Sequence, residues 1–498
     1  MVTSPVLGID FGTSNTAAGF YNARGDLLLV PVAEKVYVLP SVVWYSGRGH
    51  RLVGHAARQQ IIDDPRHTVF GSKRFLGRRY TSPFVHRHKD RFIFELAETK
   101  SGDVGVRLHD DNPYPLTHVA ADVLRRVLEL GEATLKQRFE ECVLTTPAHF
   151  GYSQRNALRQ AADKAGLKIR AMVNEPTAAA MYYAHKKGGR DTTVLVFDLG
   201  GGTFDATLMA IRGGVVEVLA TGGDAFLGGA DFDAVIVERL LERFELDHKL
   251  DLRGNNVIMQ RLLFGAEQAK VALSRDESTH FRVPCVAMKN DAFLDFDYQV
   301  TRREVEDYTA PLVEKCLGIC QDILARARMS HQQVDEIVLV GGQTRMPAIQ
   351  RRIAQVFQCN PEKHVHPELG VAVGAAILGR GQDTLIDVLS VSLGMMVPGV
   401  GAKELIPANT VVPGVRRVPL GYRPPPGQPL VLGVYESVDA TSVDRDHLGT
   451  IRVPHEWLAL HPEDLVIEAR MGEDFALQLI LHAGAARLPL QLLGPGVG

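Results

Sequence analysis

The chain has 498 residues, enough for about two to four domains, because a single hydrophobic core rarely grows past about 250–300 residues. Apolar residues make up 45% of the sequence and charged residues 23%, an ordinary soluble composition. The 55 basic and 58 acidic residues leave a formal net charge of −3, so the overall balance gives no reason to expect nucleic acid or an anionic membrane as a partner.

The first predicted strand begins almost at the N-terminus, with no basic segment, signal-like apolar core or cleavage site before it. No apolar run reaches the roughly 18–20 residues of a membrane span. The five cysteines lack the density of a disulfide-stapled domain. Cys316 and Cys320 stand four apart and would share a helix face as packing thiols. We therefore expect a cytoplasmic protein with no membrane partner.

Residues 6–16 read Val-Leu-Gly-Ile-Asp-Phe-Gly-Thr-Ser-Asn-Thr, which predicts an apolar strand, an aspartate (Asp10), a tight glycine turn and a second strand. Glycine lets the backbone approach a ligand, and its N–H groups can bond phosphate oxygens. An aspartate at a strand end can hold a hydrated Mg²⁺. Another strand is expected at residues 41–45.

Lys73 lies in a Gly-Ser-Lys-Arg-Phe segment and is a candidate for orienting an attacking water and neutralising charge on a γ-phosphate. A Lys-Arg pair is otherwise usually a surface feature. Apolar spacing predicts a helix over residues 117–137. A strand at 142–145 should run into Pro147, followed by a helix from about 153 to 165.

Glu175 lies beside a proline turn and could bond a metal-bound water or simply cap the next helix. The phosphate signature then recurs at residues 194–205, with Asp198, three glycines and Asp205. The two aspartates at positions 10 and 198 are too far apart for solenoid repeats, and the spacing favours a duplicated α/β unit. Two such hairpins could grip a triphosphate from opposite sides, as in an ATPase split into two lobes.

A third glycine site at residues 337–347 combines a strand, paired glycines and a proline-led helix, and Arg345 could stack on a base. A helix over 260–274 would place Glu267, Lys270 and Ser274 on one face, where they could bond a ribose and a purine edge. An ordinary exposed Glu/Lys pair is the alternative. The sequence contains no G-x-x-x-x-G-K-[ST] loop and no H-E-x-x-H zinc motif, and His364 and His366 are interpreted as loop residues.

The composition changes near Gly381, where an acidic and apolar stretch precedes a part rich in prolines and short β-like runs. This part predicts a small β-sandwich or partial barrel with one proline-stiffened loop and a frayed tail at 494–498. The predicted domains are an ATPase domain at 1–382 with lobes of roughly 1–190 and 191–382, a linker at 383–388 and a β domain at 389–498.

Six motifs, in order and in register, closely resemble the heat shock protein 70 chaperone family over about residues 5–380. They are the segments that begin at Asp10, Lys73, Asn174, Asp198, Leu227 and Gly341. The resemblance implies an actin-like, ribonuclease-H-like ATPase of two lobes that binds ATP or ADP. It implies that Asp10, Asp198 and Asp205 organise Mg²⁺ and K⁺, and that Lys73 and Glu175 serve the hydrolytic water.

By the same resemblance, Thr13 and Thr203 contact phosphate. The implied phosphate turns comprise Gly12, Thr13, Ser14, Asn15, Gly200, Gly201, Gly202 and Thr203. The implied adenosine pocket comprises Glu267, Lys270, Ser274, Gly341, Gly342, Gln343, Arg345 and Glu368, the last where the family more often has aspartate. Pro147 and Arg155 match residues that relay nucleotide state to a peptide-binding domain.

The resemblance weakens after the linker, although residues 392–394 and 405–413 still match. The helical lid that follows the β-subdomain in the family is not expected here, so bound peptide should be released faster. Ala171 stands where the family usually carries an arginine that helps to dock J-domain co-chaperones, so a standard J-domain partnership is not predicted. Extended unfolded peptides and a nucleotide exchange factor are the implied partners.

The leading hypothesis is a chaperone-like ATPase that acts in protein folding and stress response, in which slow ATP hydrolysis biases the β domain between states of different peptide affinity. A sugar kinase shares the two-lobed architecture but needs a sugar pocket with a carboxylate base, which no motif indicates. A nucleotide-gated scaffold or an actin-like filament protein is the third hypothesis, and the β domain after a defined linker argues against a filament.

Overall fold

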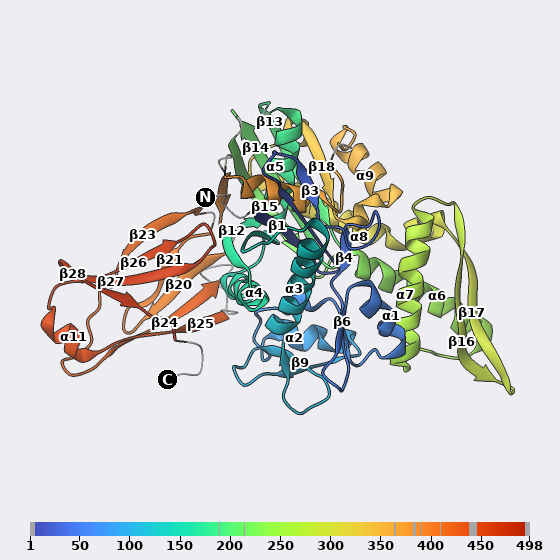
Figure 1. The fold of residues 1–498 in the computed structure, drawn as a ribbon, viewed down its shortest axis with the longest axis horizontal. Coiled ribbons are helices and arrows are strands. Elements are labelled where there is room, and N and C mark those ends of the chain that lie inside the picture. Colours follow the sequence, from blue (N-terminus) through green and yellow to red (C-terminus); the bar gives the residue numbers. More distant parts are fainter. Residues whose placement is uncertain are drawn as a thin grey trace.

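The computed structural model describes residues 5–188, 190–213, 215–362, 365–381, 385–389, 391–408, 410–437 and 446–493. Figure 1 shows a large α/β body with a separate body of β-strands at one side. Three features expected from the sequence lie outside the described residues, namely His364, the start of the linker at 383–384 and the tail at 494–498.

The first lobe is built on a sheet with the strand order β12-β11-β1-β2-β3, and β4 pairs with β2. β1 and β2 form the first predicted hairpin, in which Asp10 pairs with Ala17 in antiparallel register. β11 pairs with β1 in parallel, and β12 pairs with β11. The strands are β1 (Val6–Phe11), β2 (Asn15–Tyr21), β3 (Leu27–Leu29), β4 (Val38–Pro40), β11 (Glu141–Thr146) and β12 (Lys168–Asn174).

The second lobe repeats this topology. β13 (Thr192–Leu199) and β14 (Phe204–Arg212) form the second hairpin, which places Asp198 directly opposite Asp205. β18 (Glu336–Val340) pairs with β13 in parallel, as β11 does with β1. β15 (Val215–Asp224) pairs with β14 on the far side of the sheet. The shared topology agrees with the predicted duplication of an α/β unit.

Two helices, α5 (Glu175–Lys187) and α10 (Gly370–Gly379), cross between the two sheets. α5 packs against β13, β14 and β18 of the second lobe, and α10 packs against β1, β2 and β11 of the first. Gly374 allows the helices to touch, because a Cβ there would lie 1.7 Å from the carbonyl oxygen of Ala178. Each half of the α/β body therefore ends in a helix that contacts the sheet of the other half.

The outer parts of the first lobe contain mainly short elements, and α3 buries Val119, Val123 and Val127 at the helical spacing expected from the sequence. These elements are β5 (Val43–Tyr45), β6 (Arg51–Val53), α1 (His55–Asp63), β7 (Thr68–Val69), η1 (Ser72–Arg74), α2 (Pro83–His88), η2 (Lys89–Arg91), β8 (Glu95–Glu98), β9 (Val104–Arg107), β10 (Tyr114–Pro115), α3 (Leu116–Leu135) and α4 (Tyr152–Ala165).

The outer parts of the second lobe contain longer helices and one long hairpin, at the edge of the molecule opposite the β domain (Figure 1). On α8, Cys316 and Cys320 are fully buried, which confirms the expected packing role. The elements are α6 (Gly229–His248), α7 (Asn256–Leu273), β16 (Ser278–Lys289), β17 (Ala292–Thr301), α8 (Arg302–Arg326), η3 (His331–Gln333), η4 (Gly342–Arg345) and α9 (Pro347–Phe357).

The C-terminal part is a β-sandwich of two four-stranded sheets, with orders β21-β20-β24-β25 and β23-β26-β27-β28. Leu432 and Ile451 of the first sheet and Ile467 and Leu481 of the second are fully buried in one core. The elements are β20 (Ser392–Val397), β21 (Gly401–Ile406), β22 (Val411–Val412), β23 (Gly414–Pro419), β24 (Leu430–Ser437), β25 (Asp446–Val453), α11 (His455–Leu460), β26 (Leu465–Met471), β27 (Leu477–Ala483) and β28 (Ala486–Leu490).

The segment between the two bodies is a strand, β19 (Leu385–Val388), where the sequence suggested only a linker. β19 pairs in parallel with β15 of the second lobe and antiparallel with β22 of the β domain. β19 therefore provides hydrogen-bond partners for backbone groups at the edge of β15. The composition of this segment does not reveal that pairing. Among the helices of the described residues, none has the length and apolar character required to span a bilayer.

Candidate active site

The turns of the two hairpins face each other at close range. A Cβ on Gly201 would lie 2.0 Å from the Ser14 hydroxyl oxygen, and one on Gly202 would lie 2.4 Å from a methyl carbon of Thr13. Glycine at both positions lets the turns approach this closely, because a side chain there would displace Ser14 or Thr13. The two predicted phosphate turns therefore meet across the boundary between the lobes.

A cavity of about 600 Å³, including its open mouth, lies between the two turns. Most of the predicted phosphate and catalytic residues line this cavity. They are Asp10, Gly12, Thr13, Ser14, Asn15, Lys73, Glu175, Asp198, Gly200, Gly201, Gly202 and Thr203. Gly341, Gly342 and Glu368 line it from the third glycine site, together with Pro367.

The carboxylates of this cavity are buried and repel one another. Burial, followed by the neighbouring charge of Glu175, raises the pKa of Asp10 to about 7. Burial also raises the pKa of Asp198 well above its usual range, and the charges of Glu175, Asp205 and Asp10 act in the same direction. Such a cluster of buried anions is stabilised when it takes up a cation.

Lys73 is the basic group inside this cluster. Its ammonium donates to Glu175 Oε1 at 2.5 Å and also to the carbonyl oxygen of Phe11, and the residue is only 2% exposed. Burial nevertheless raises the pKa of Glu175, against the opposing charge of Lys73. The arrangement places a buried acid–base pair beside the two phosphate turns.

The residues fit a hydrated Mg²⁺ better than a directly coordinated metal. Among the described residues, no group of three or more His, Cys, Asp and Glu side chains is arranged to ligate an ion directly. Mg²⁺ keeps several waters and is often held by one or two carboxylates, which Asp10 and Asp198 can provide at the ends of their strands. Asp205 is buried but does not line the cavity. The metal set predicted from the sequence stays a prediction.

Lys270 and Gln343, predicted for the adenosine pocket, lie beside Gly229, whose N–H donates to the carbonyl oxygen of Gly200 in the second phosphate turn. Lys270 donates to the carbonyl oxygen of Gly229 at 2.8 Å and pairs with Asp233 at 2.8 Å. A Cβ on Gly229 would lie 3.1 Å from Gln343 Oε1. Neither Lys270 nor Gln343 lines the cavity.

The other predicted adenosine residues have partners within the protein. Glu267 pairs with Arg58 of the first lobe at 2.5 Å, and Arg345 pairs with Glu368 at 2.8 Å. Ser274 donates to the carbonyl oxygen of Lys270 at 3.2 Å instead of facing the cavity. Its predicted place in the adenosine pocket stays a prediction.

Several interlobe contacts were not predicted from the sequence. Arg74 donates to the carbonyl oxygen of Gly202 at 2.9 Å, and Arg91 pairs with Asp231 at 3.1 Å. His149 of the first lobe bonds Asp205 of the second at 2.9 Å. The partners in each contact lie far apart in the sequence. The sequence offered a signal only for Arg74, which stands next to Lys73 in a segment bounded by glycines.

A second contact region joins the α/β body to the β domain near α4. Arg155 is fully buried and donates to Thr146 Oγ1 at 2.5 Å and to Asn174 Oδ1 at 2.7 Å. Its guanidinium lies 4.1 Å from the centre of the Phe475 ring, which belongs to the β26–β27 loop. Arg159 pairs with Asp474 of the same loop at 3.2 Å. Arg155, predicted as a relay residue, therefore contacts the β domain directly.

The fold and the cavity define an actin-like α/β protein of two lobes with a nucleotide-type cleft, joined to a β-sandwich domain. A family model described as Hsp70 protein matches residues 6–420 of the chain. The protein therefore belongs to the Hsp70 family, whose members are nucleotide-binding ATPases and act as ATP-dependent chaperones.

Proposed function

We propose that this protein is an ATP-dependent chaperone that binds and slowly hydrolyses ATP in the interlobe cavity and couples the nucleotide state to its β domain. The observation that carries the proposal is the buried Lys73–Glu175 pair, with 2.5 Å between Nζ and Oε1, in the same cavity as both glycine turns. A pair of this kind serves hydrolysis, whereas simple nucleotide binding does not require it.

The proposed roles follow from the positions of the residues. The N–H groups of the two glycine turns would cradle the phosphates, with Thr13 and Thr203 beside them. Lys73 would neutralise charge on the γ-phosphate, and Glu175 would orient the attacking water. Mg²⁺, when bound, would neutralise phosphate charge, and Asp10 and Asp198 would hold it through water molecules.

The proposed coupling runs from the cavity through the loop after β11 to the start of α4. The backbone N–H of Tyr152, at the first position of α4, donates to the carboxylate of Glu436 on β24. This carboxylate lies at the positive end of the helix dipole. The bond to Glu436 ties the β domain to α4, which begins beside the active site, and the strand β19 ties the domain to the second lobe. A change of the angle between the lobes would therefore shift the β domain.

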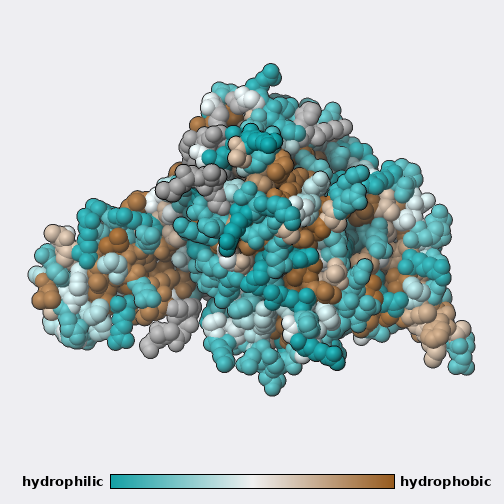
Figure 2. Space-filling view, viewed as in Figure 1, coloured by the Kyte–Doolittle hydropathy of each residue, from teal (hydrophilic) through white to brown (hydrophobic). Residues whose placement is uncertain are grey.

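An apolar surface on the β domain supports peptide binding. Met396 of β20 and Val431 of β24 are 37% and 44% exposed. They share one face of their sheet, because Met396 pairs with Gly433, which lies two residues from Val431 on the same strand. Figure 2 shows apolar side chains gathered on the visible side of this domain. An extended apolar peptide is the partner that this surface fits.

The test is ATP turnover measured with and without an extended apolar peptide, and peptide affinity measured in ATP and in ADP. We expect the peptide to change turnover and its affinity to differ between the nucleotides. The variant Met396→Ser should weaken peptide binding, whereas Met288→Ser, at a 64% exposed position on the β16–β17 hairpin, should not. Unchanged turnover together with no peptide binding in either nucleotide would contradict the chaperone proposal and leave the ATPase proposal standing.

A further inference from the structure

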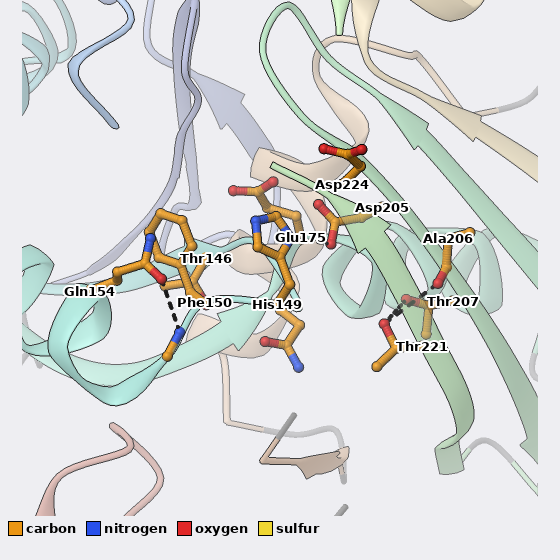
Figure 3. Close-up of polar contacts among 12 residues, drawn as sticks. Thr146, His149, Phe150, Gln154, Glu175, Asp205, Ala206, Thr207, Thr221 and Asp224 are labelled. Atoms are coloured by element: carbon orange, nitrogen blue, oxygen red, sulfur yellow. Dashed lines mark hydrogen bonds and ion pairs between the residues drawn. The ribbon is translucent and has the colours of Figure 1, made fainter. Parts of the chain in front are cut away.

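His149 reaches across the interlobe boundary to the second hairpin. It lies in a turn between β11 and α4 that is closed by a bond from the Phe150 N–H to the Pro147 carbonyl oxygen at 3.1 Å. Its Nδ1 atom is 2.9 Å from Asp205 Oδ1, and the Asp205 side chain is only 2% exposed. Figure 3 shows the imidazole between Glu175 and Asp205.

Asp205 needs a partner for electrostatic reasons. It faces Asp198 directly across the hairpin, and its charge contributes to the raised pKa values of both Asp198 and Glu175. Lys73 is committed to Glu175, on the opposite side of the cleft. A buried carboxylate that lacks a cation or a hydrogen-bond donor is strongly destabilising.

We propose that His149 is a positioning residue for ATP hydrolysis, which holds the Asp205 carboxylate across the cleft in place of the K⁺ ion that resemblance to the family implies for the set of Asp10, Asp198 and Asp205. The inference rests on the proposed ATPase function, because only a hydrolytic site needs these carboxylates held in one arrangement.

The hydrogen-bond pattern supports this role. An ionised Asp205 can only accept, so the hydrogen of the bond must lie on Nδ1 of His149, and a neutral imidazole suffices. The other ring nitrogen, Nε2, is buried and has no partner in the part of the chain that the structure describes, so the ring is oriented by its bond to Asp205. A K⁺ ion on Asp205 would have to compete with this bond for Oδ1.

The bond also connects the two halves of the site. His149 belongs to the loop that leads into α4, and Asp205 belongs to the hairpin that carries the second phosphate turn. This donor therefore adds a contact between these elements to those of Arg74 and Arg91, in addition to satisfying the buried charge.

The experiment compares the full-length wild type with His149→Phe, which keeps a flat ring but removes the donor, and with His149→Asn, which keeps one N–H donor. Two quantities are measured with Mg²⁺ present: ADP affinity by calorimetry, and the rate of ATP turnover. Both are measured in potassium chloride and in tetramethylammonium chloride, at equal ionic strength and constant pH. The control is His185→Phe, at an exposed histidine of α5. Crystals of the wild type and His149→Phe are also soaked in thallium(I), which stands in for K⁺ and is located by anomalous scattering.

We expect the wild type, His149→Asn and His185→Phe to be insensitive to the choice of cation. His149→Phe should lose about 10- to 100-fold in turnover and ADP affinity in tetramethylammonium, as expected for a lost hydrogen bond to a charged group, and should recover in potassium. Thallium should be found at Asp205 in His149→Phe alone. A wild type that depends on potassium as strongly as His149→Phe, or that binds thallium at Asp205, would overturn the inference. If no form hydrolyses ATP, the proposed ATPase fails, and the thallium positions still decide the role of His149.

Discussion

Buried carboxylates occur in two settings in this protein, with opposite effects on their pKa values. In the interlobe cavity, burial raises the pKa of Asp10 to about 7. In the β domain, hydrogen bonds from Arg417 and Arg470 lower the pKa of Glu468 to about 2. Asp10 is thus arranged to receive a cation from outside, whereas Glu468 already has its cations within the fold.

The first prediction at the residue scale concerns Lys73. The variant Lys73→Ala should bind ATP but hydrolyse it about 10²- to 10³-fold more slowly, because Glu175 loses its buried cation and the γ-phosphate loses an electrostatic contact. The measurement is single-turnover hydrolysis with a separate titration of ATP affinity. Lys187→Ala is the control, since Lys187 pairs with Glu362 at 2.7 Å and does not line the cavity. Wild-type turnover in Lys73→Ala would refute the assigned role.

The second prediction at this scale concerns the pH dependence of stability through Glu468, which Arg417 contacts at 2.8 Å. Because its pKa in the folded state, about 2, lies below the ordinary value of 4.5, folding favours the ionised form. Its stabilising contribution should be complete above about pH 4.5 and disappear as the pH falls towards 2. Thermal melts of the wild type and Glu468→Gln should therefore differ at pH 7 and converge at low pH. Glu404→Gln, at an exposed ion pair, should show little difference at either pH.

At the scale of elements, close backbone packing determines where helices can cross. α5 and α10 touch through Gly374, and α10 also lies on β1, where a Cβ on Gly8 would be 2.2 Å from the Ala376 nitrogen. The sequence shows these glycines but not their neighbours. Because the contacts are with backbone atoms, no change of rotamer can relieve a clash.

The prediction at this scale compares two helical glycines. Gly374→Ala should destabilise the protein by about 1–3 kcal/mol, because its Cβ would overlap the Ala178 carbonyl group. Gly318→Ala, in α8, should stabilise it by about 0.5–1 kcal/mol, since a Cβ there meets nothing within 4 Å and alanine is the better helix former. Chemical denaturation followed by circular dichroism measures both changes. Equal effects of the two substitutions would show that the helix crossing is not tightly packed.

At the scale of the whole molecule, the β domain is held against the ATPase body by contacts with residues of α4 and β12. Asp474 pairs with Arg159, and the backbone N–H of Met172 donates to the Glu473 carbonyl oxygen at 3.2 Å. Phe475 covers the buried Arg155 guanidinium, with the two groups 4.1 Å apart. This phenylalanine has a left-handed φ of 56°, which a bulky residue adopts only when its surroundings fix it.

The prediction at this scale uses that conformation. Phe475→Gly should keep the turn, because glycine favours a positive φ, but should uncover Arg155 and loosen the domain contact. We expect a larger radius of gyration in small-angle scattering and faster hydrogen exchange at the start of α4. Phe293→Gly, at a 72% exposed position of β17, is the matched control and should leave both unchanged. An unaltered radius of gyration in Phe475→Gly would show that the ring does not hold the domains together.

Local sequence patterns were sufficient to predict several elements of this protein. Alternation of apolar residues and glycine turns identified both hairpins, and the helical period identified α3 and α4 to within a few residues of their ends. Glycine spacing and acidic strand ends also predicted two phosphate-binding turns, and Gly12, Gly201 and Gly202 of these turns line one cavity. These hairpins, helices and turns can be predicted because their backbone geometry is specified by residues that are close together in the sequence.

The contacts between distant segments form only when the chain packs, and local patterns did not predict them. It placed Arg58 on Glu267, His149 on Asp205 and Phe475 on Arg155, and it turned the expected linker into the strand β19. None of these pairs has a periodic or spacing signature, because their residues come together only after the sheets, helices and domains have packed. The physical reason is that the whole fold sets burial and strand register. Burial and register determine which polar side chains lose water together, and those side chains must then form hydrogen bonds or ion pairs with one another.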